Sequence, residues 1–306
     1  MLALATLVAS TAAAQKFEVP SQFDELVGSV GTVTASSKET LLDIARRFSV
    51  GQEEIVMANP SVDRWLPTDG ADVVIPTRYI LPRTERKGLV LNVPEMRLYY
   101  YPPRGYGEPA VVHTFPVSIG RMDWSTPICH TRIVKKTENP AWHPPASIIA
   151  ERKEKGEPPP ELIPPGPDNP LGQFAFRLGL PGYLIHGTNK PYGVGMRVTH
   201  GCVRMYPEDI EFLYPLVPVG TPVALVNQPI KVGWLGDRLY IEIHPALDEE
   251  QATWSAKKRA QELIQLESDK RLLTIDRAAL QDALARKDGI PTAIGRAGKA
   301  GTAAAH

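Results

Sequence analysis

The chain has 306 residues, of which 43% are hydrophobic and 22% charged, as in an ordinary globular protein, and its length predicts two domains. The 34 basic and 34 acidic side chains give a formal net charge of zero, so no basic surface argues for nucleic acid as a partner. The 30 prolines favour loops and short strands over long helices.

Residues 1–14 are small and apolar and end in three alanines before Gln15. This pattern is typical of a secretory signal peptide. The run is too short to cross a bilayer, which takes about 20 residues, so we expect no transmembrane span. No cysteine follows the three alanines, so we expect no lipid anchor there. We therefore expect an exported protein.

Residues 29–81 have the pattern of a small separate unit. A short strand around residues 30–33 precedes a predicted helix at 39–48, where apolar residues recur at helical spacing. A second short helix at 53–60 ends at Asn59-Pro60, and residues 71–77 form a closing strand. Strand, helix, helix and strand in this order resemble a LysM module, which binds glycan chains. Lys38-Glu39 replace the Gly-Asp turn of such modules, and a compact spacer is the alternative.

Short strand-like runs dominate from Leu89 onward, punctuated by Pro and Gly; they lie at 89–93, 97–101, 110–119 and 130–136. Residues 143–171 are rich in proline and charge, which predicts a long surface loop of the kind that often forms a lid. Residues 182–188 then predict a strand that delivers His186 to a surface. A short helix from Pro207 to about Tyr214 and a strand at 221–227 follow.

The C-terminal region has a different composition. Residues 231–244 predict a hairpin around Gly236-Asp237, and residues 248–285 predict an amphipathic helix or a helix pair. Residues 288–306 are small and rich in glycine and alanine, so we expect a disordered tail.

The run HGTNKPYGVGMRVTHGCVRM, residues 186–205, combines a cysteine, two histidines and four glycines. Cys202 follows His200 by two residues and His186 by sixteen. A thiol needs a nearby base to be a strong nucleophile at neutral pH, and glycines let the backbone turn tightly beside a ligand. Arg204 supplies a cation two residues beyond the thiol. The run therefore indicates a cysteine acyltransferase or hydrolase.

Three other interpretations of Cys202 remain open at this point. It is a buried structural cysteine, a zinc ligand, or half of a disulfide with Cys129. A structural zinc site takes four ligands, whereas the chain has two cysteines. A disulfide would silence the nucleophile. The polar, glycine-rich surroundings of Cys202 favour chemistry over a core position.

His186-Gly187-Thr188 and Thr199-His200-Gly201-Cys202-Val203-Arg204 resemble the signature of the L,D-transpeptidases, the YkuD-type enzymes of bacterial cell walls, and most of all their Gram-negative periplasmic group. Cys129-His130 depart from the pattern, because the family usually has a small residue or glycine there. Other segments resemble the same domain: LVLNVPEMRLYYYPP (89–103), FPVSIGRMDWSTP (115–127), NPAWHPP (139–145) and PPGPDNPLG (164–172).

The resemblance implies a mainly β protein with α/β elements. We expect a YkuD-like β-sandwich catalytic domain, a small βααβ LysM-like N-terminal module and a helical C-terminal extension. The expected divisions are a signal peptide at 1–14, the LysM-like module at 29–81, the catalytic domain at 86–227, a hairpin and helical extension at 228–287, and the tail at 288–306. The implied location is the periplasm.

The resemblance also implies a role for each residue of the signature. Cys202 is the nucleophile and His186 the proton donor and acceptor, whose imidazolium would lower the thiol pKa from about 8.5. His200 supports the loop or the substrate, and Thr188 orients His186. Backbone amides around Gly201 to Val203 stabilise the oxyanion, and Arg204 holds the loop or a carboxylate. No metal or organic cofactor is expected.

The implied acyl donor is a peptidoglycan stem tetrapeptide that ends in a diaminoacyl residue and D-alanine. The acceptor is an amine of another stem or a lysine of an outer-membrane lipoprotein, and glycan is a further partner. Two alternatives remain: a cysteine hydrolase of wall stems, and a non-catalytic wall-binding protein.

Overall fold

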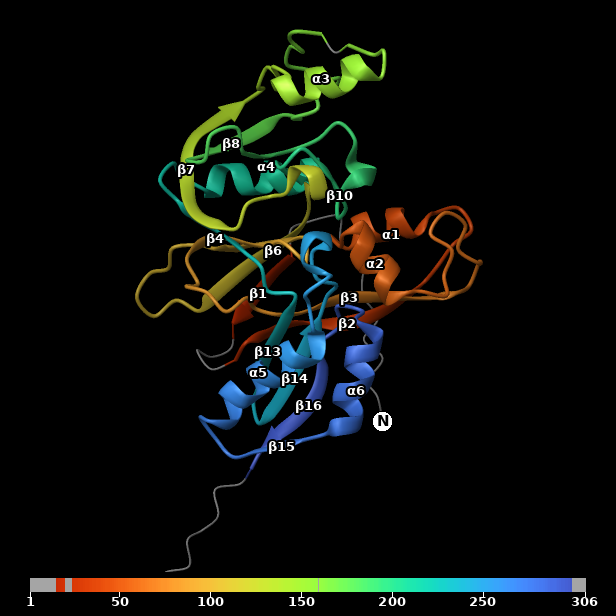
Figure 1. Cartoon of the computed structure of the whole chain (residues 1–306), viewed down its shortest axis with the longest axis vertical. Coiled ribbons are helices and arrows are strands. Elements are labelled where there is room, and N and C mark those ends of the chain that lie inside the picture. The colour runs from red at the N-terminus through yellow and green to blue at the C-terminus, as the bar shows by residue number, and fades with distance from the viewer. Residues whose placement is uncertain (1–14, 20–23, 159, 299–306) are drawn as a thin grey trace, which may run out of the picture.

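The computed structural model describes residues 15–19, 24–158 and 160–298, and the predicted signal peptide at 1–14 lies outside the described residues. Within these ranges, no helix has the length and apolar character needed to cross a membrane. Three units pack together (Figure 1): an N-terminal βααβ unit, a central β-sheet and a C-terminal unit of strands and helices.

The central sheet is closed on itself. Its strands follow the order β1-β6-β11-β9-β8-β7-β12-β4-β5, and β5 also pairs with β6, while β10 pairs with β6 off this path. Closure gives each strand in the ring from β6 round to β5 a neighbour on both edges, while β1 and β10 pair with β6 alone. The strands are β1 (Gln15–Val19), β4 (Gly88–Asn92), β5 (Arg97–Tyr101), β6 (Ala110–Gly120), β7 (Cys129–Glu138), β8 (Phe174–Leu178), β9 (Leu184–His186), β10 (Arg197–Thr199), β11 (Val203–Met205) and β12 (Pro222–Val226).

The main hydrophobic core lies inside this sheet. Phe115 on β6, Phe176 on β8 and Ile185 on β9 are fully buried in it. Every second residue of a strand faces the same side of the sheet, so alternate residues face the core. Helix α4 (Pro207–Leu216) adds Ile210 and Leu213 to the same core. The helix begins at a proline followed by two acidic residues, as its sequence predicts. The mainly β character expected from the sequence is confirmed.

The N-terminal unit has the predicted order of strand, two helices and strand: β2 (Leu26–Thr34), α1 (Leu41–Arg47), α2 (Gln52–Ala58) and β3 (Asp72–Ile80). Strand β2 begins at Leu26, earlier than predicted, and pairs antiparallel with β3 along nine residues. Thr40 caps α1, because its hydroxyl oxygen accepts the backbone N–H of Asp43 at 3.1 Å. This cap starts the helix directly after Lys38-Glu39.

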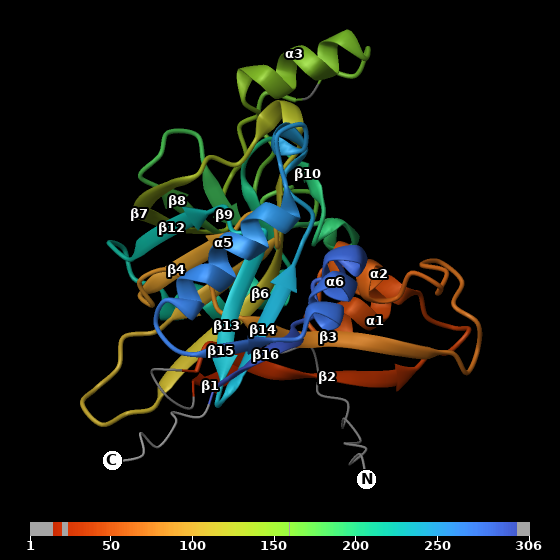
Figure 2. The same ribbon diagram turned by 60° about the horizontal axis from the view of Figure 1, so that its bottom comes forward.

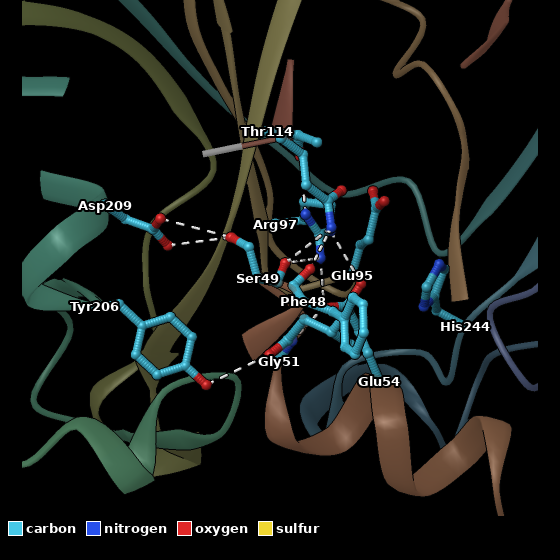
Figure 3. A network of polar contacts seen from close by, with 12 residues as sticks. Phe48, Ser49, Gly51, Glu54, Glu95, Arg97, Thr114, Tyr206, Asp209 and His244 are labelled. Carbon is cyan, nitrogen blue, oxygen red and sulfur yellow. Dashed lines mark hydrogen bonds and ion pairs between the residues drawn. The ribbon is translucent and has the colours of Figure 1, made fainter. Parts of the chain in front are cut away.

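A buried ion pair attaches the N-terminal unit to the central sheet (Figure 3). Arg97 of β5 is fully buried and donates to both carboxylate oxygens of Glu54 on α2, at 2.9 and 2.7 Å. The same guanidinium donates to the Thr114 hydroxyl at 3.1 Å and to the Ser49 carbonyl at 3.2 Å. A buried charge is tolerated when it is paired and hydrogen-bonded in this way. The unit is therefore an integral part of the packed protein.

The C-terminal unit is a four-stranded sheet in the order β13-β14-β16-β15, covered by two helices (Figure 2). Helix α5 packs on β13, and α6 packs on β14 and β16. The predicted hairpin and helices are present. The elements are β13 (Ile230–Leu235), β14 (Arg238–Ile243), α5 (Ala256–Ser268), β15 (Leu273–Ile275), α6 (Arg277–Arg286) and β16 (Thr292–Ala297).

The prediction of a disordered tail from residue 288 is wrong for residues 292–297, which form β16. Ile294 anchors this strand, since its side chain is fully buried against the helices. A side chain in place of Gly295 would lie 2.7 Å from the Thr274 carbonyl oxygen, so the small residues allow close strand pairing. The extension is therefore an α/β unit and not a purely helical one.

Candidate active site

A cleft of about 500 Å³ opens on one face of the central sheet. Cys202, His186, His200 and Arg204 all line it, although His186 comes from β9 and the other three from the β10–β11 region. Strands β9 and β11 are parallel neighbours, with His186 opposite Arg204. The folded chain thus brings together the residues that the sequence selected.

The turn that carries Cys202 is held by hydrogen bonds to its backbone. The Thr199 hydroxyl donates to the Cys202 carbonyl at 2.6 Å, and the Thr126 hydroxyl donates to the Gly201 carbonyl at 3.0 Å. Gly201 has a φ of +96°, which disfavours any residue with a Cβ. A Cβ there would also lie 2.8 Å from the Tyr183 ring. These contacts hold the backbone of the turn in the conformation that places Cys202 in the cleft.

His186 ends β9 and is buried, with 5% of its surface exposed. Its Nδ1 lies 2.6 Å from the Gly187 carbonyl oxygen. A carbonyl only accepts, so Nδ1 carries the proton and Nε2 is unprotonated in the neutral ring. The Thr188 hydroxyl instead accepts the Lys190 N–H at 2.9 Å. The orienting contact expected of Thr188 is thus made by the Gly187 carbonyl.

Burial sets the protonation of His186 and Cys202. It lowers the pKa of His186 to about 4, with the nearby positive charge of Arg204 acting in the same direction. Burial also raises the pKa of the Cys202 thiol. Both groups are therefore neutral near pH 7, and the expected imidazolium–thiolate pair is not the resting state. The Cys202 thiol donates to the Gly182 carbonyl oxygen, at 3.6 Å.

His200 faces the lid segment between β7 and β8. This segment contains α3 (Ala146–Glu154), which stands beyond the ends of these strands (Figure 1). Glu151 on α3 lies 2.7 Å from Nε2 of His200 and also pairs with Arg121 at 2.5 Å. Trp124 packs against the other side, with 5.5 Å between the two ring centroids. His200 therefore joins the lid to the turn that carries Cys202.

The remaining predicted residues play different parts. The Val203 side chain is buried in the main core, so only its backbone belongs to the site. Arg204 is partly buried, and its Nε has no hydrogen-bond partner within the described residues. A Cβ at Gly193 would lie 3.4 Å from Arg204 Nη1, so the guanidinium packs against the glycine-rich loop. The oxyanion role of the Gly201–Val203 amides stays a prediction.

Comparison with known proteins decides the family. The family described as the L,D-transpeptidase catalytic domain, YkuD, matches residues 86–225. The "Probable L,D-transpeptidase YbiS" of Escherichia coli K12 is 38% identical over 295 residues, which cover 93% of this chain and 94% of that protein. The chain belongs to the L,D-transpeptidase family. The "Probable L,D-transpeptidase ErfK/SrfK" of the same organism is 38% identical over 85% of this chain and 84% of its own.

The enzyme is therefore an L,D-transpeptidase. It is also similar to the crystal structure of L,D-transpeptidase 3 from Mycobacterium tuberculosis, with 17% sequence identity, coverage of 71% of this chain and 100% of the other, and a TM-score of 0.33. The assignment rests on the family match and on the curated relatives.

Three residues that support this transpeptidase site were not predicted from the sequence. Thr126 accepts the Gly120 N–H at 2.9 Å while it holds Gly201. A Cβ on Gly120 would lie 3.0 Å from the Gly201 Cα, so two glycines pack face to face. Thr126 and Gly120 lie in the segment 115–127, and the resemblance of this segment to the family was the signal that could have identified them. Glu151 lies in the lid, and no pattern in the sequence indicated its contact with His200.

Cys129 lies apart from Cys202 in the enzyme. It begins β7, which is separated from β11 by β8 and β9. The path along the sheet from β7 to β11 takes three steps of about 4.8 Å each. A disulfide requires Cα atoms within about 7 Å. Both cysteines are free, and the Cys129 side chain packs at the edge of the main core.

One group of side chains away from the cleft has the composition of a metal site. Glu95, Glu242 and His244 are buried and close enough together to share an ion. The Lys231 ammonium lies among them, 2.8 Å from Glu95 and 2.7 Å from Glu242, and donates to the Ile80 carbonyl at 2.6 Å. Lys231 thus supplies the positive charge, and the group joins the three units.

Proposed function

We propose that Cys202 is the nucleophile of this L,D-transpeptidase and that a peptidoglycan stem tetrapeptide is the acyl donor. The observation that carries this proposal is that Cys202 and the base His186 line one cleft beneath a helical lid. The expected donor ends in a diaminoacyl residue and D-alanine. A cleft of about 500 Å³ is of the size that encloses a peptide segment.

In the first step, Nε2 of His186 accepts the thiol proton as the Cys202 sulfur attacks the carbonyl carbon of the diaminoacyl residue. The carbonyl oxygen becomes an oxyanion, for which the backbone amides around Gly201–Val203 are the proposed donors. The C–N bond then breaks, and the imidazolium returns the proton to the departing nitrogen of D-alanine. A thioester on Cys202 and neutral His186 remain.

In the second step, an acceptor amine attacks the thioester. His186 takes a proton from this amine and returns it to the sulfur, so the thiol is regenerated and a new amide is formed. The proposed acceptor is an amine of a second stem or a lysine of an outer-membrane lipoprotein. Water in place of the amine would give a hydrolase.

The proposed location is the periplasm, reached through the signal peptide at 1–14. We also propose that the βααβ unit is a LysM-like module that binds the glycan of the wall. Its α2–β3 loop supports this, because Trp65 is 63% exposed and aromatic rings stack on sugar faces. Asp63 accepts the backbone N–H groups of Trp65 and Leu66 at 2.8 Å each, which holds the loop in shape.

Incubation of the full mature chain with defined muropeptides, followed by mass spectrometry of the products, tests the function. We expect D-alanine release and an acceptor-linked product with wild type, and neither with Cys202→Ser at unchanged fold by circular dichroism. D-alanine release without a linked product would identify a hydrolase. Full turnover by Cys202→Ser would overturn the assignment.

A further inference from the structure

Two cations lie on the floor of the active-site cleft, opposite each other on neighbouring strands. Lys135 on β7 pairs in register with Arg177 on β8, and Arg177 pairs with Leu184 on β9. Ile185 on β9 pairs with Val203 on the parallel strand β11. Leu184 and Cys202 each come one residue earlier, so they lie side by side. Lys135, Arg177, Leu184 and Cys202 therefore form one row across four strands, and all four line the cleft.

An irregularity in β7 places Lys135 in this row. Ile133 points into the core, so strict alternation would turn residue 135 inward as well. The register shifts between Ile133 and Lys135, and Lys135 is exposed at the cleft. The next residue, Lys136, instead reaches back over the Tyr214 ring, 4.4 Å from its centroid. Bulges of this kind re-aim side chains beside functional sites.

The pair has no counter-charge among the residues that the structure describes. Like charges directly opposite on a sheet destabilise it. Neither Lys135 nor Arg177 has an ion pair or a side-chain hydrogen bond within the described ranges, and none of the described residues that line the cleft is an aspartate or glutamate. The lid acid Glu151 is already bonded to His200, Arg121 and Lys155. An anionic ligand would supply the missing charge.

The position of the row indicates which part of the donor peptide carries the anionic group. Strands lie about 4.8 Å apart, which puts the Arg177 backbone about 10 Å and the Lys135 backbone about 14 Å from Cys202. The carboxylate of the departing residue lies only about 4 Å from the attacked carbonyl carbon, so it stays beside the sulfur. Extended peptide advances about 3.4 Å per residue, so a group one to three residues back on the acyl side reaches the row.

We propose that Lys135 and Arg177 form a subsite for a carboxylate on the acyl part of the donor peptide. Arg177 offers a planar guanidinium suited to two parallel hydrogen bonds, and Lys135 adds a second charge. The inference rests on the proposed function, since it concerns the donor of that reaction. The subsite selects acidic stems and keeps the acyl group anchored while the acceptor enters.

The test compares wild type, Lys135→Gln/Arg177→Gln and the control Arg132→Gln, an exposed cation on β7 that does not line the cleft. Each enzyme receives three donor tetrapeptides: one with free carboxylates, one amidated on the acyl side, and one amidated at the C-terminus. Acylation of Cys202 is followed by intact-protein mass, and thiol reactivity by iodoacetamide.

We expect the double variant to lose about tenfold or more in kcat/KM with the free donor and with the C-terminal amide, and nothing with the acyl-side amide. Iodoacetamide rates and the Arg132→Gln enzyme should be unchanged. The subsite would be overturned if the loss in the double variant disappeared with the C-terminal amide instead of the acyl-side amide. An equal loss with all three donors, or an equal loss in Arg132→Gln, would also overturn it. Absence of acylation in wild type would instead overturn the proposed function.

Discussion

The carboxylate of Glu151 lies 2.7 Å from Nε2 of His200 and thereby joins the lid helix α3 to the turn that carries Cys202. No side chain of α3 is buried, so the helix has little hydrophobic attachment. Lys155, His200 and Arg121 bind this carboxylate and hold its pKa well below the usual range. Polar contacts at Glu151 therefore hold the lid in its position over the cleft.

Replacement of Glu151 by glutamine is expected to loosen the lid. The amide cannot pair with His200 and Arg121 as an anion, so acyl transfer should slow by about tenfold. Amide hydrogen exchange across residues 146–154 should rise at unchanged melting temperature. Glu154→Gln, an exposed acid on the same helix, is the control. Equal exchange and equal rates in the two variants would show that Glu151 does not hold the lid.

The acid limb of the pH–rate profile reports the base. Because the pKa of His186 is lowered to about 4, its neutral form is present throughout the range above that value. Acylation of Cys202 should therefore keep its rate down to about pH 5 and fall only nearer pH 4. His186→Ala should lower the rate about 10²- to 10⁴-fold, and His200→Ala much less. A limb near pH 6.5, or a larger loss in His200→Ala, would reverse the two roles.

Asp209 makes the stability of the protein depend on pH. Burial, with the charge of Glu208, raises its pKa to about 8 from 3.8. Its carboxyl group accepts from the Ser49 hydroxyl, at 3.5 Å from each oxygen (Figure 3). The folded state retains the proton that the unfolded state loses. This contribution to stability is complete below about pH 4 and is lost as the pH rises through 8, by about 1.4 kcal/mol per pH unit.

Asp209→Asn keeps the shape without the titration. Its melting temperature should exceed that of wild type by a margin that grows from pH 5 to pH 8, measured by calorimetry in one salt concentration. A margin that is constant with pH would mean that Asp209 is already ionised in the folded protein.

Cys129 should be dispensable for catalysis. It is free, lies on β7 with β8 and β9 between it and β11, and packs at the edge of the core. Cys129→Ala should transfer acyl groups at the wild-type rate, with and without reductant, and lose about 1 kcal/mol of stability or less. A wild-type enzyme that is silent until reduced, beside an active variant, would reveal a redox switch.

Local patterns predicted what depends on local physics. The glycine and histidine spacing of residues 186–205 located the site, and alternation located most strands. The strand β16 was missed because its small residues resemble a tail, and only the burial of Ile294 in the C-terminal unit orders them. The bond from His186 to Gly187 and the pair of Glu151 with His200 depend on the folded backbone. No sequence spacing specifies contacts of that kind.

The direct test of the central claim is the mass of the acyl-enzyme. The mature chain is mixed with a tetrapeptide donor without acceptor, quenched in acid and mapped by peptide mass spectrometry. A single adduct on Cys202, equal to the donor minus D-alanine and released by hydroxylamine, is the predicted result. No adduct, or an adduct on Cys129 or another residue while the enzyme turns over, would contradict it.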